Sequence, residues 1–219
     1  MVSRKIEVLP DAEVVSRRAA AFIAERARHG IAERGAFSLA LSGGRTPARM
    51  VGLLAREDVA WDAVDVYQVD ERIAPHNDPE RNLTLLEQMF PVGCVHPMPV
   101  EDEDLPAAAA RYAAELPPRL DLVHLGLGTD GHTASLVPGC PALDIRDRDV
   151  ALSIEYHGRR RMTLTYPALD RAREAVWVVI GEDKRDGMRR LLAGDLSLPA
   201  SHVETPVQTV FADRAAAGS

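Results

Sequence analysis

Short apolar segments alternate with helical segments along this chain, and this alternation constrains its fold more than any other feature. The expected strands are residues 36–41, 64–69, 120–125, 149–155, 162–165, 175–180 and 207–211. The expected helices are residues 14–31, 48–56, 82–90, 106–115 and 184–192, with a short helical turn at 199–202. Such alternation predicts an α/β fold: one doubly wound, mostly parallel, Rossmann-like sheet with helices on both faces.

The length and the cysteine content fit a single cytoplasmic domain. We expect residues 1–211 of the 219 to form that domain and residues 212–219 to form a flexible tail. Cys94 and Cys140 have no C-x-x-C spacing, so we expect both thiols to be unpaired, as is usual in a reducing compartment. No apolar run suggests an export signal or a membrane span. The oligomeric state is left open between a monomer and a small homo-oligomer.

The net negative charge of the chain excludes some classes of binding partner. A net charge of −7 and a pI near 5.5 argue against nucleic acid or an anionic membrane, because both require a basic face. A small anionic ligand needs only a few backbone N–H groups and one or two cations. We therefore expect a small molecule as the partner.

Polar residues follow four of the expected strands. Ligands of open α/β sheets lie beyond the carboxyl ends of the strands, so we expect the four groups to share one crevice. The first group favours a phosphate-binding turn at a helix start, and it consists of Ser42, Gly43, Gly44, Arg45 and Thr46. It lacks the lysine of a Walker A loop. An ordinary tight turn with Thr46 as the N-cap is the alternative.

Charged residues follow two further expected strands, and another charged residue begins a strand. Asp70 and Arg72 follow the second strand, where a carboxylate can orient a partner and a guanidinium can hold a phosphate. Lys184 follows the most apolar strand and is expected over the crevice from the first turn of a helix. Arg161 begins a later strand and adds another cation. Each of these residues could instead belong to an ordinary solvated surface.

The segment G-L-G-T-D-G-H at residues 126–132 permits two interpretations. Its glycines match the dinucleotide-binding pattern G-x-G-x-x-G, and they are Gly126, Gly128 and Gly131. A dinucleotide site is expected in the first βαβ unit, however, and this segment lies in the middle of the chain. His132 follows the last glycine, where an expected helix N-terminus would keep its imidazole neutral and able to act as a general base. The alternative is that His132 is a hydrogen-bonded histidine at a helix cap, with a structural and not a catalytic role.

Metal and serine-triad chemistry find little support in the sequence. The histidines show neither H-E-x-x-H nor any other ligand spacing, and no G-x-S-x-G elbow is present. We therefore expect neither a metal nor a cofactor.

Five motifs in order resemble the 6-phosphogluconolactonases of the pentose phosphate pathway. They are S-G-G-R-T-P from Ser42, D-E-R from Asp70, L-G-L-G-T-D-G-H-T-A-S-L-V-P from Leu125, R-M-T-L-T from Arg161 and G-E-D-K from Gly181. The related glucosamine-6-phosphate deaminases carry D-E-Y and G-H-x-A-F-N-E-P. Here Arg72 replaces the tyrosine, and S-L-V-P stands where F-N-E-P would be.

The resemblance implies a metal-free hydrolase that converts 6-phospho-D-glucono-1,5-lactone to 6-phospho-D-gluconate. His132 would take a proton from water, while Asp130 would shape the turn or orient the base or the substrate. Backbone N–H groups of the glycine turn or Arg72 would stabilise the developing oxyanion. The expected residues for binding the phosphosugar lactone are Ser42, Gly43, Gly44, Arg45, Thr46, Asp70, Gly128, Gly131, Arg161 and Lys184. Two alternatives stay open: a sugar-phosphate isomerase or deaminase, and a phosphosugar sensor without catalysis. The absence of a DNA-binding extension and the presence of His132 disfavour the sensor.

Overall fold

A seven-stranded sheet runs through the centre of the computed structural model, which describes residues 2–218 apart from the side chain of Arg45. Every neighbouring pair in this sheet is parallel. The strands, in their order across the sheet, are β1 (Ser3–Leu9), β10 (Val207–Asp213), β9 (Glu174–Val179), β6 (Leu122–Gly126), β2 (Phe37–Leu41), β3 (Val64–Gln68) and β5 (Val95–His96). The predicted doubly wound α/β fold is confirmed.

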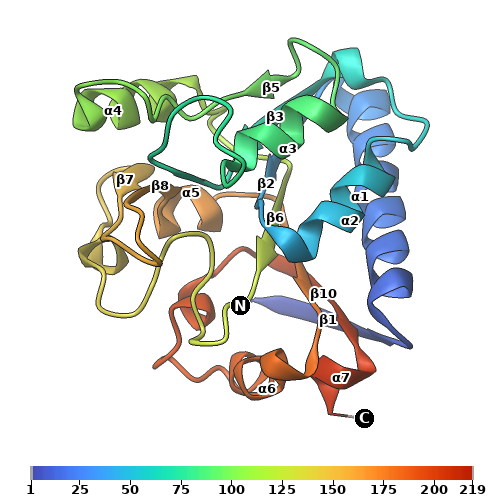
Figure 1. The fold of residues 1–219 in the computed structure, drawn as a ribbon. Coiled ribbons are helices and arrows are strands. Elements are labelled where there is room, and N and C mark those ends of the chain that lie inside the picture. The colour runs from blue at the N-terminus through green and yellow to red at the C-terminus, as the bar shows by residue number, and fades with distance from the viewer. Residues whose placement is uncertain (1, 219) are drawn as a thin grey trace.

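The helices cover both faces of this sheet (Figure 1). They are α1 (Ala12–Arg34), α2 (Arg45–Leu54), α3 (Asn82–Met89), α4 (Leu105–Glu115), α5 (Tyr166–Asp170), α6 (Arg185–Leu192) and α7 (Arg214–Ala217). The Asp11 carboxylate caps α1 by accepting from Val14 N at 2.9 Å, and Gly35 ends it at φ +80°. Among residues 2–218, none of the helices combines the length and the hydropathy needed to cross a membrane.

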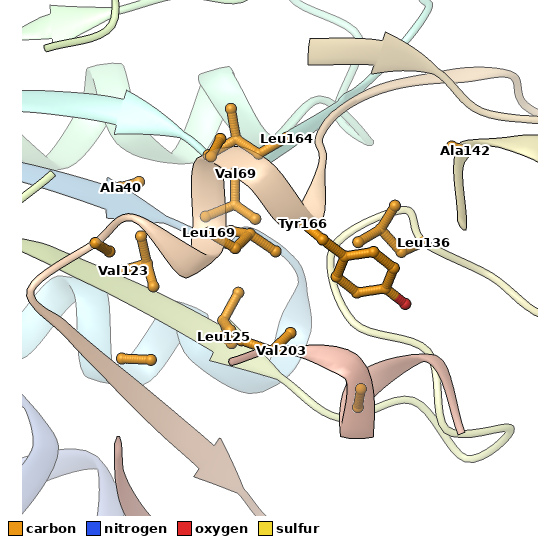
Figure 2. Close-up of a cluster of buried hydrophobic side chains, with 14 of the residues drawn as sticks. Ala40, Val69, Val123, Leu125, Leu136, Ala142, Leu164, Tyr166, Leu169 and Val203 are labelled. Carbon is orange, nitrogen blue, oxygen red and sulfur yellow. The ribbon is translucent and has the colours of Figure 1, made fainter. Parts of the chain in front are cut away.

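Side chains alternate between the two faces of each central strand. Leu39 and Leu41 on β2 pack with the cluster under α1 and α2, whereas Ala40 between them packs on the opposite face. Figure 2 shows part of the hydrophobic cluster on this opposite face, in which Val123 and Leu125 of β6 lie beside Leu169 of α5. Because both faces are buried, these strands are continuous apolar runs, as the sequence indicated.

A small antiparallel sheet lies on the face opposite α1. It contains β4 (Asp70–Arg72), β8 (Arg161–Leu164) and β7 (Val150–Leu152) in that order. β7 and β8 lie at the strands expected over 149–155 and 162–165, but their pairing with β4 was not predicted, because β4 is only three residues long and all three are charged. Its register places Arg161 opposite Arg72, so two segments that are far apart in the sequence meet at one point.

The two ends of the chain differ from the prediction. β1 was missed because it is an edge strand with an irregular burial pattern, in which Ile6 is exposed. β10 continues to Asp213, two residues past the expected domain boundary, and α7 follows where a flexible tail was expected. Asp213 caps α7 by accepting from Ala216 N at 2.8 Å, and the Ala216 side chain is buried. Residue 219 lies outside the described residues.

The chain reverses its direction of winding between β2 and β6. After β2 it proceeds to β3 and β5 on one side, and after β6 it proceeds to β9 and β10 on the other. The loops that leave the carboxyl ends of β2 and β6 therefore diverge, and a crevice is expected at such a point.

Candidate active site

A cavity of about 200 Å³ lies at this reversal point. Residues from all four predicted strand-end groups line it, and Arg161 of β8 joins them. Its lining residues are Ser42, Gly43, Gly44, Thr46, Pro47, Asp70, Arg72, Asn82, His124, Gly126, Leu127, Gly128, His132, Ala134, Arg161, Val178, Ile180 and Lys184.

All the predicted site residues whose side chains the structure describes line this cavity, except two. Asp130 and Gly131 lie behind the lining, in the loop that carries His132. The Arg45 side chain lies outside the described part of the structure. Its predicted contact with phosphate therefore stays a prediction.

His132 and Asp130 form a directly hydrogen-bonded pair. His132 Nδ1 lies 2.5 Å from Asp130 Oδ1, which also accepts from His132 N at 3.2 Å. Since an ionised carboxylate only accepts, Nδ1 carries the ring proton and Nε2 holds a free lone pair. Burial pushes the pKa of Asp130 upward, but hydrogen bonds from His132 and Tyr156 outweigh it and hold the pKa below its usual value. Asp130 therefore stays ionised at neutral pH.

The glycines of this loop make room for the pair. A Cβ on Gly128 would lie 2.0 Å from His132 Nδ1, so only glycine permits this approach. Gly131 has φ +84°, and a Cβ there would lie 2.4 Å from a methyl carbon of Leu198. Gly128 thus packs against the histidine, and Gly131 packs against a neighbouring loop.

The helix expected after Gly131 is absent, and that prediction was wrong. Thr133 and Leu136 instead form an isolated antiparallel bridge around a turn, in which Ala134 has φ +51°. Pro138 and Gly139 follow, and both oppose helix formation. His132 is therefore held by Asp130 and not by a helix dipole. The dinucleotide interpretation also loses the helix N-terminus that it requires.

The loop after β2 ends in an uncapped helix start. α2 begins at Arg45 with Gly44 as its N-cap at φ +106°, and Gly44 makes no side-chain capping hydrogen bond. Thr46 is therefore not the N-cap, contrary to the alternative considered from the sequence. Ser42 Oγ donates to His124 O at 2.9 Å, which ties this loop to β6. The positive end of the α2 dipole is thus directed at the cavity.

Asp70 and Arg72 belong to a buried hydrogen-bond network. Asp70 accepts from Asn82 Nδ2 at 3.1 Å and from Ser135 Oγ at 2.5 Å. Arg72 Nη1 donates to Asn82 Oδ1 at 2.5 Å. Both oxygens of Asp70 are therefore already occupied, whereas Arg72 has further N–H groups to offer a ligand.

Two further cations, Arg161 and Lys184, line the cavity. Arg161 Nη1 lies 3.8 Å from Asp70 Oδ2, and the Arg161 side chain is 10% exposed. Lys184 ends the 3₁₀ turn Glu182–Lys184, just before α6 and not within its first turn. Its Nζ lies 3.2 Å from Asp183 Oδ2, and its side chain is 18% exposed. An anion between them would meet positive charge from two directions.

Sequence reasoning missed several residues of the site. Asn82 links Asp70 with Arg72, and Tyr156 Oη donates to Asp130 Oδ2 at 3.1 Å. Glu71 is buried beneath the site, and His124 lies in the cavity wall next to the β2 loop. Asn82 follows a loop rather than a strand, and Tyr156 belongs to a hairpin, so neither position carried a strand-end signal. Among the described residues, no group of His, Cys, Asp and Glu side chains could hold a metal ion.

Comparison with known proteins identifies the family. The family model described as glucosamine-6-phosphate isomerases/6-phosphogluconolactonase matches residues 10–212. A 6-phosphogluconolactonase from a Synechocystis strain is 36% identical over 205 residues, which cover 86% of this chain and 85% of that protein. One from a Nostoc strain is 31% identical over 237 residues and covers 100% of this chain and 98% of that protein.

A solved structure shares the fold. The crystal structure of 6-phosphogluconolactonase from Thermotoga maritima superposes with a TM-score of 0.87 at 24% identity, covering 96% of this chain and 100% of that one. The sequence resemblance is therefore confirmed by independent sequence and fold comparisons. This chain belongs to the glucosamine-6-phosphate isomerase/6-phosphogluconolactonase family and groups with its 6-phosphogluconolactonases, which are lactone hydrolases.

Proposed function

We propose that this protein hydrolyses 6-phospho-D-glucono-1,5-lactone to 6-phospho-D-gluconate in the oxidative pentose phosphate pathway, using His132 as a general base and no metal ion. Its curated relatives bear the name of that activity and match most of this chain. The observation that carries the mechanism is the 2.5 Å contact between His132 Nδ1 and Asp130 Oδ1. This contact leaves Nε2 free on a residue that lines the cavity.

The chemical step is balanced within the substrate, water and His132. Nε2 accepts a proton from water as the water oxygen bonds to C1 of the lactone. The tetrahedral intermediate then collapses, the bond from C1 to the ring oxygen breaks, and the imidazolium returns the proton to that oxygen. The carboxylic acid formed at C1 releases its remaining proton to solvent and becomes the carboxylate of the product. Asp130 stabilises the imidazolium without taking its proton, as the carboxylate of a catalytic triad does.

The cations of the cavity suit the charges of the substrate. Lys184 and the α2 N-terminus would hold the 6-phosphate, on the side of the cavity formed by β9 and the β2 loop. Arg72 or Arg161 would stabilise the oxyanion at C1. Binding the remote phosphate fixes the lactone against His132, so that part of the binding energy lowers the barrier of the chemical step.

The test is an assay of lactone hydrolysis in which a glucose-6-phosphate dehydrogenase generates the substrate in situ. A chelator is present, and the rate of spontaneous hydrolysis is subtracted. His132→Asn should lower kcat by a factor on the order of 100. His29→Asn is the matched control, since His29 is exposed on α1, and it should leave the rate unchanged. Loss of wild-type activity in the chelator would overturn metal independence, and a normal rate for His132→Asn would remove His132 from the mechanism. Release of ammonia from glucosamine 6-phosphate would identify a deaminase instead.

A further inference from the structure

A tight hairpin carries Tyr156 toward the loop of His132. β7 and β8 pair antiparallel, and the chain between them turns at His157 and Gly158, whose φ values are +52° and +74°. Tyr156 N donates to Arg159 O at 2.9 Å, and Arg159 N donates to Tyr156 O at 3.4 Å. Two successive residues with positive φ form a type I′ turn, the most compact kind of hairpin connection. This turn fixes the backbone of Tyr156 at the hairpin tip.

The Tyr156 side chain contacts both members of the catalytic pair. Its hydroxyl donates to Asp130 Oδ2 at 3.1 Å, while Asp130 Oδ1 accepts from His132. Its ring meets the His132 ring edge to face, with centroids 5.2 Å apart at 69°. The Arg161 guanidinium carbon lies 5.5 Å from the Tyr156 ring centroid. Tyr156 itself is not among the lining residues of the cavity.

These contacts restrict the movement of the pair. A carboxylate with one bonded oxygen can rotate about its Cβ–Cγ bond, whereas a donor on each oxygen fixes its plane. The edge-to-face ring contact opposes a flip of the imidazole, which would put Cδ2 in the place of Nδ1 and Cε1 in the place of Nε2. Fixing both groups keeps the free lone pair of His132 directed at the cavity.

We propose that Tyr156 is a positioning residue that holds the Asp130–His132 pair in its base-competent arrangement from outside the cavity. The role in turnover rests on the proposed lactone hydrolysis. The contacts of Tyr156 with Asp130 and His132 are present in the protein without substrate. The side chain acts through its hydroxyl on Asp130 and through its ring on His132.

The hydroxyl also alters how strongly Asp130 attracts a charged imidazole. A carboxylate that loses one donor keeps more negative charge on the remaining oxygen and stabilises an imidazolium more. The other charged or titratable groups near the pair are His157 at the hairpin tip, Arg161 on β8, and, in the lining of the cavity, Asp70, Arg72, His124 and Lys184. Since Tyr156→Phe alters none of these groups, a change in the pH profile reports the lost hydroxyl.

The first test is the kinetics of Tyr156→Phe, which keeps the ring and removes the hydroxyl. We expect kcat to fall about tenfold, as for the loss of one hydrogen bond to a charged group, with KM within about twofold. The acid limb of kcat/KM should move to higher pH by about 0.3 to 0.5 unit. Tyr166→Phe is the matched control, because the buried Tyr166 hydroxyl donates to Pro199 O at 2.8 Å outside this cavity. It should leave kcat and the pH profile unchanged.

The second test needs no substrate. Nitrogen-15 spectra of the His132 ring should show a protonated Nδ1 and an unprotonated Nε2 in the wild type. Tyr156→Phe should broaden and shift both signals, because Asp130 and the imidazole are then held less firmly, and Tyr166→Phe should not. Identical ring signals in Tyr156→Phe and the wild type would overturn the proposal, as would an unchanged kcat and pH profile. If the wild type fails to hydrolyse the lactone, the proposed function falls, but the spectra still decide whether Tyr156 holds the pair.

Discussion

The Asn82 side chain lies so close to Gly43 that a Cβ on Gly43 would be 2.2 Å from Asn82 Cγ. The same amide donates to Asp70 and accepts from Arg72. The loop after β2 and the segment after β3 therefore interlock through one side chain. The position of Arg72 in the cavity depends on there being no side chain at residue 43.

Gly43→Ala should therefore damage the site more than the fold. The added methyl must displace Asn82, and a shift of about 1 Å in a positioned group can cost on the order of 100-fold in rate. We expect kcat/KM to fall at least tenfold. Gly52→Ala is the matched control within α2, because its Cβ would have no contact closer than 3.7 Å, to Met89 Sδ. That variant should keep full activity and gain stability, as alanine does over glycine in a helix. Equal activity in the two variants would contradict the interlock.

The side-chain signal of Lys184 should shift when a phosphosugar binds, whereas that of Lys5 should not. The chain has two lysines, Lys5 and Lys184, and Lys5 is exposed on β1. Reductive methylation with carbon-13 formaldehyde labels both side chains, so each gives its own signal. Titration with 6-phosphogluconate should shift the Lys184 signal and leave Lys5 in place. Lys184→Ala should raise KM about tenfold or more, the loss expected for one charged contact, with a smaller effect on kcat. A shift at Lys5 alone would place the phosphate elsewhere.

Glu71 should matter for stability. This carboxylate is fully buried and accepts from Arg72 N, Asn82 N, Leu83 N and Gln68 Nε2, while Arg81 Nε lies 3.2 Å away. In Glu71→Gln an amide NH₂ would face some of these donors. We expect the free energy of unfolding in urea to fall by about 3 to 5 kcal/mol, as when a buried ion pair is broken. Glu80→Gln changes an exposed carboxylate on the neighbouring loop and should cost less than about 1 kcal/mol.

His124 should make the fold sensitive to acid. Its side chain is fully buried, neither ring nitrogen has a hydrogen-bond partner in the described structure, and burial lowers its pKa to about 4. The unfolded chain therefore takes up this proton near pH 6.5, well before the folded protein does. Between pH 6.5 and 4 the residue removes stability as the pH falls, by up to about 3 kcal/mol in total.

Comparison with His124→Leu isolates this effect. Burial raises the pKa of Asp170 to about 6, and a raised carboxyl pKa adds stability as the pH falls over part of the same range. The wild-type curve alone therefore mixes two opposite contributions. Because Asp170 is common to both proteins, the difference in unfolding free energy between His124→Leu and the wild type should grow in favour of the variant from pH 7 to 4.5. Parallel curves would contradict the neutral buried state of His124.

The central strands β2, β3, β6, β9 and β10 could be predicted because local sequence determines them, whereas β1, β4 and β5 were missed. A buried parallel strand is a continuous apolar run, and the polar residues that follow it lie at the ligand-binding edge, so Ser42, Asp70, His132 and Lys184 could all be assigned to one crevice. The structure places them there. Even the tautomer of His132 follows from a carboxylate only two residues away in the sequence.

The parts of the fold and of the site that could not be predicted depend on contacts between segments that are distant in the sequence. The pairing of Asp70 with Thr163 in the small sheet, and the contact of Tyr156 with Asp130, leave no periodic pattern in the sequence. The helix expected after Gly131 failed for another reason. The third glycine of a G-x-G-x-x-G pattern usually precedes a helix, but Ala134 adopts a positive φ and the chain turns back to form a bridge. Pro138 and Gly139, which follow, also oppose a helix here.

The pairing of β1 has a consequence for how the protein is made. β1 is the first strand to be synthesised, and β10 is the only strand with which it pairs among residues 2–218. At a synthesis rate of about 5 to 20 residues per second, β1 waits about 10 to 40 seconds for that partner. Until then one edge of the nascent sheet is missing and Ile6 and Val8 extend from an unpaired strand. The β1 edge of the sheet can therefore form only after β10 has been synthesised.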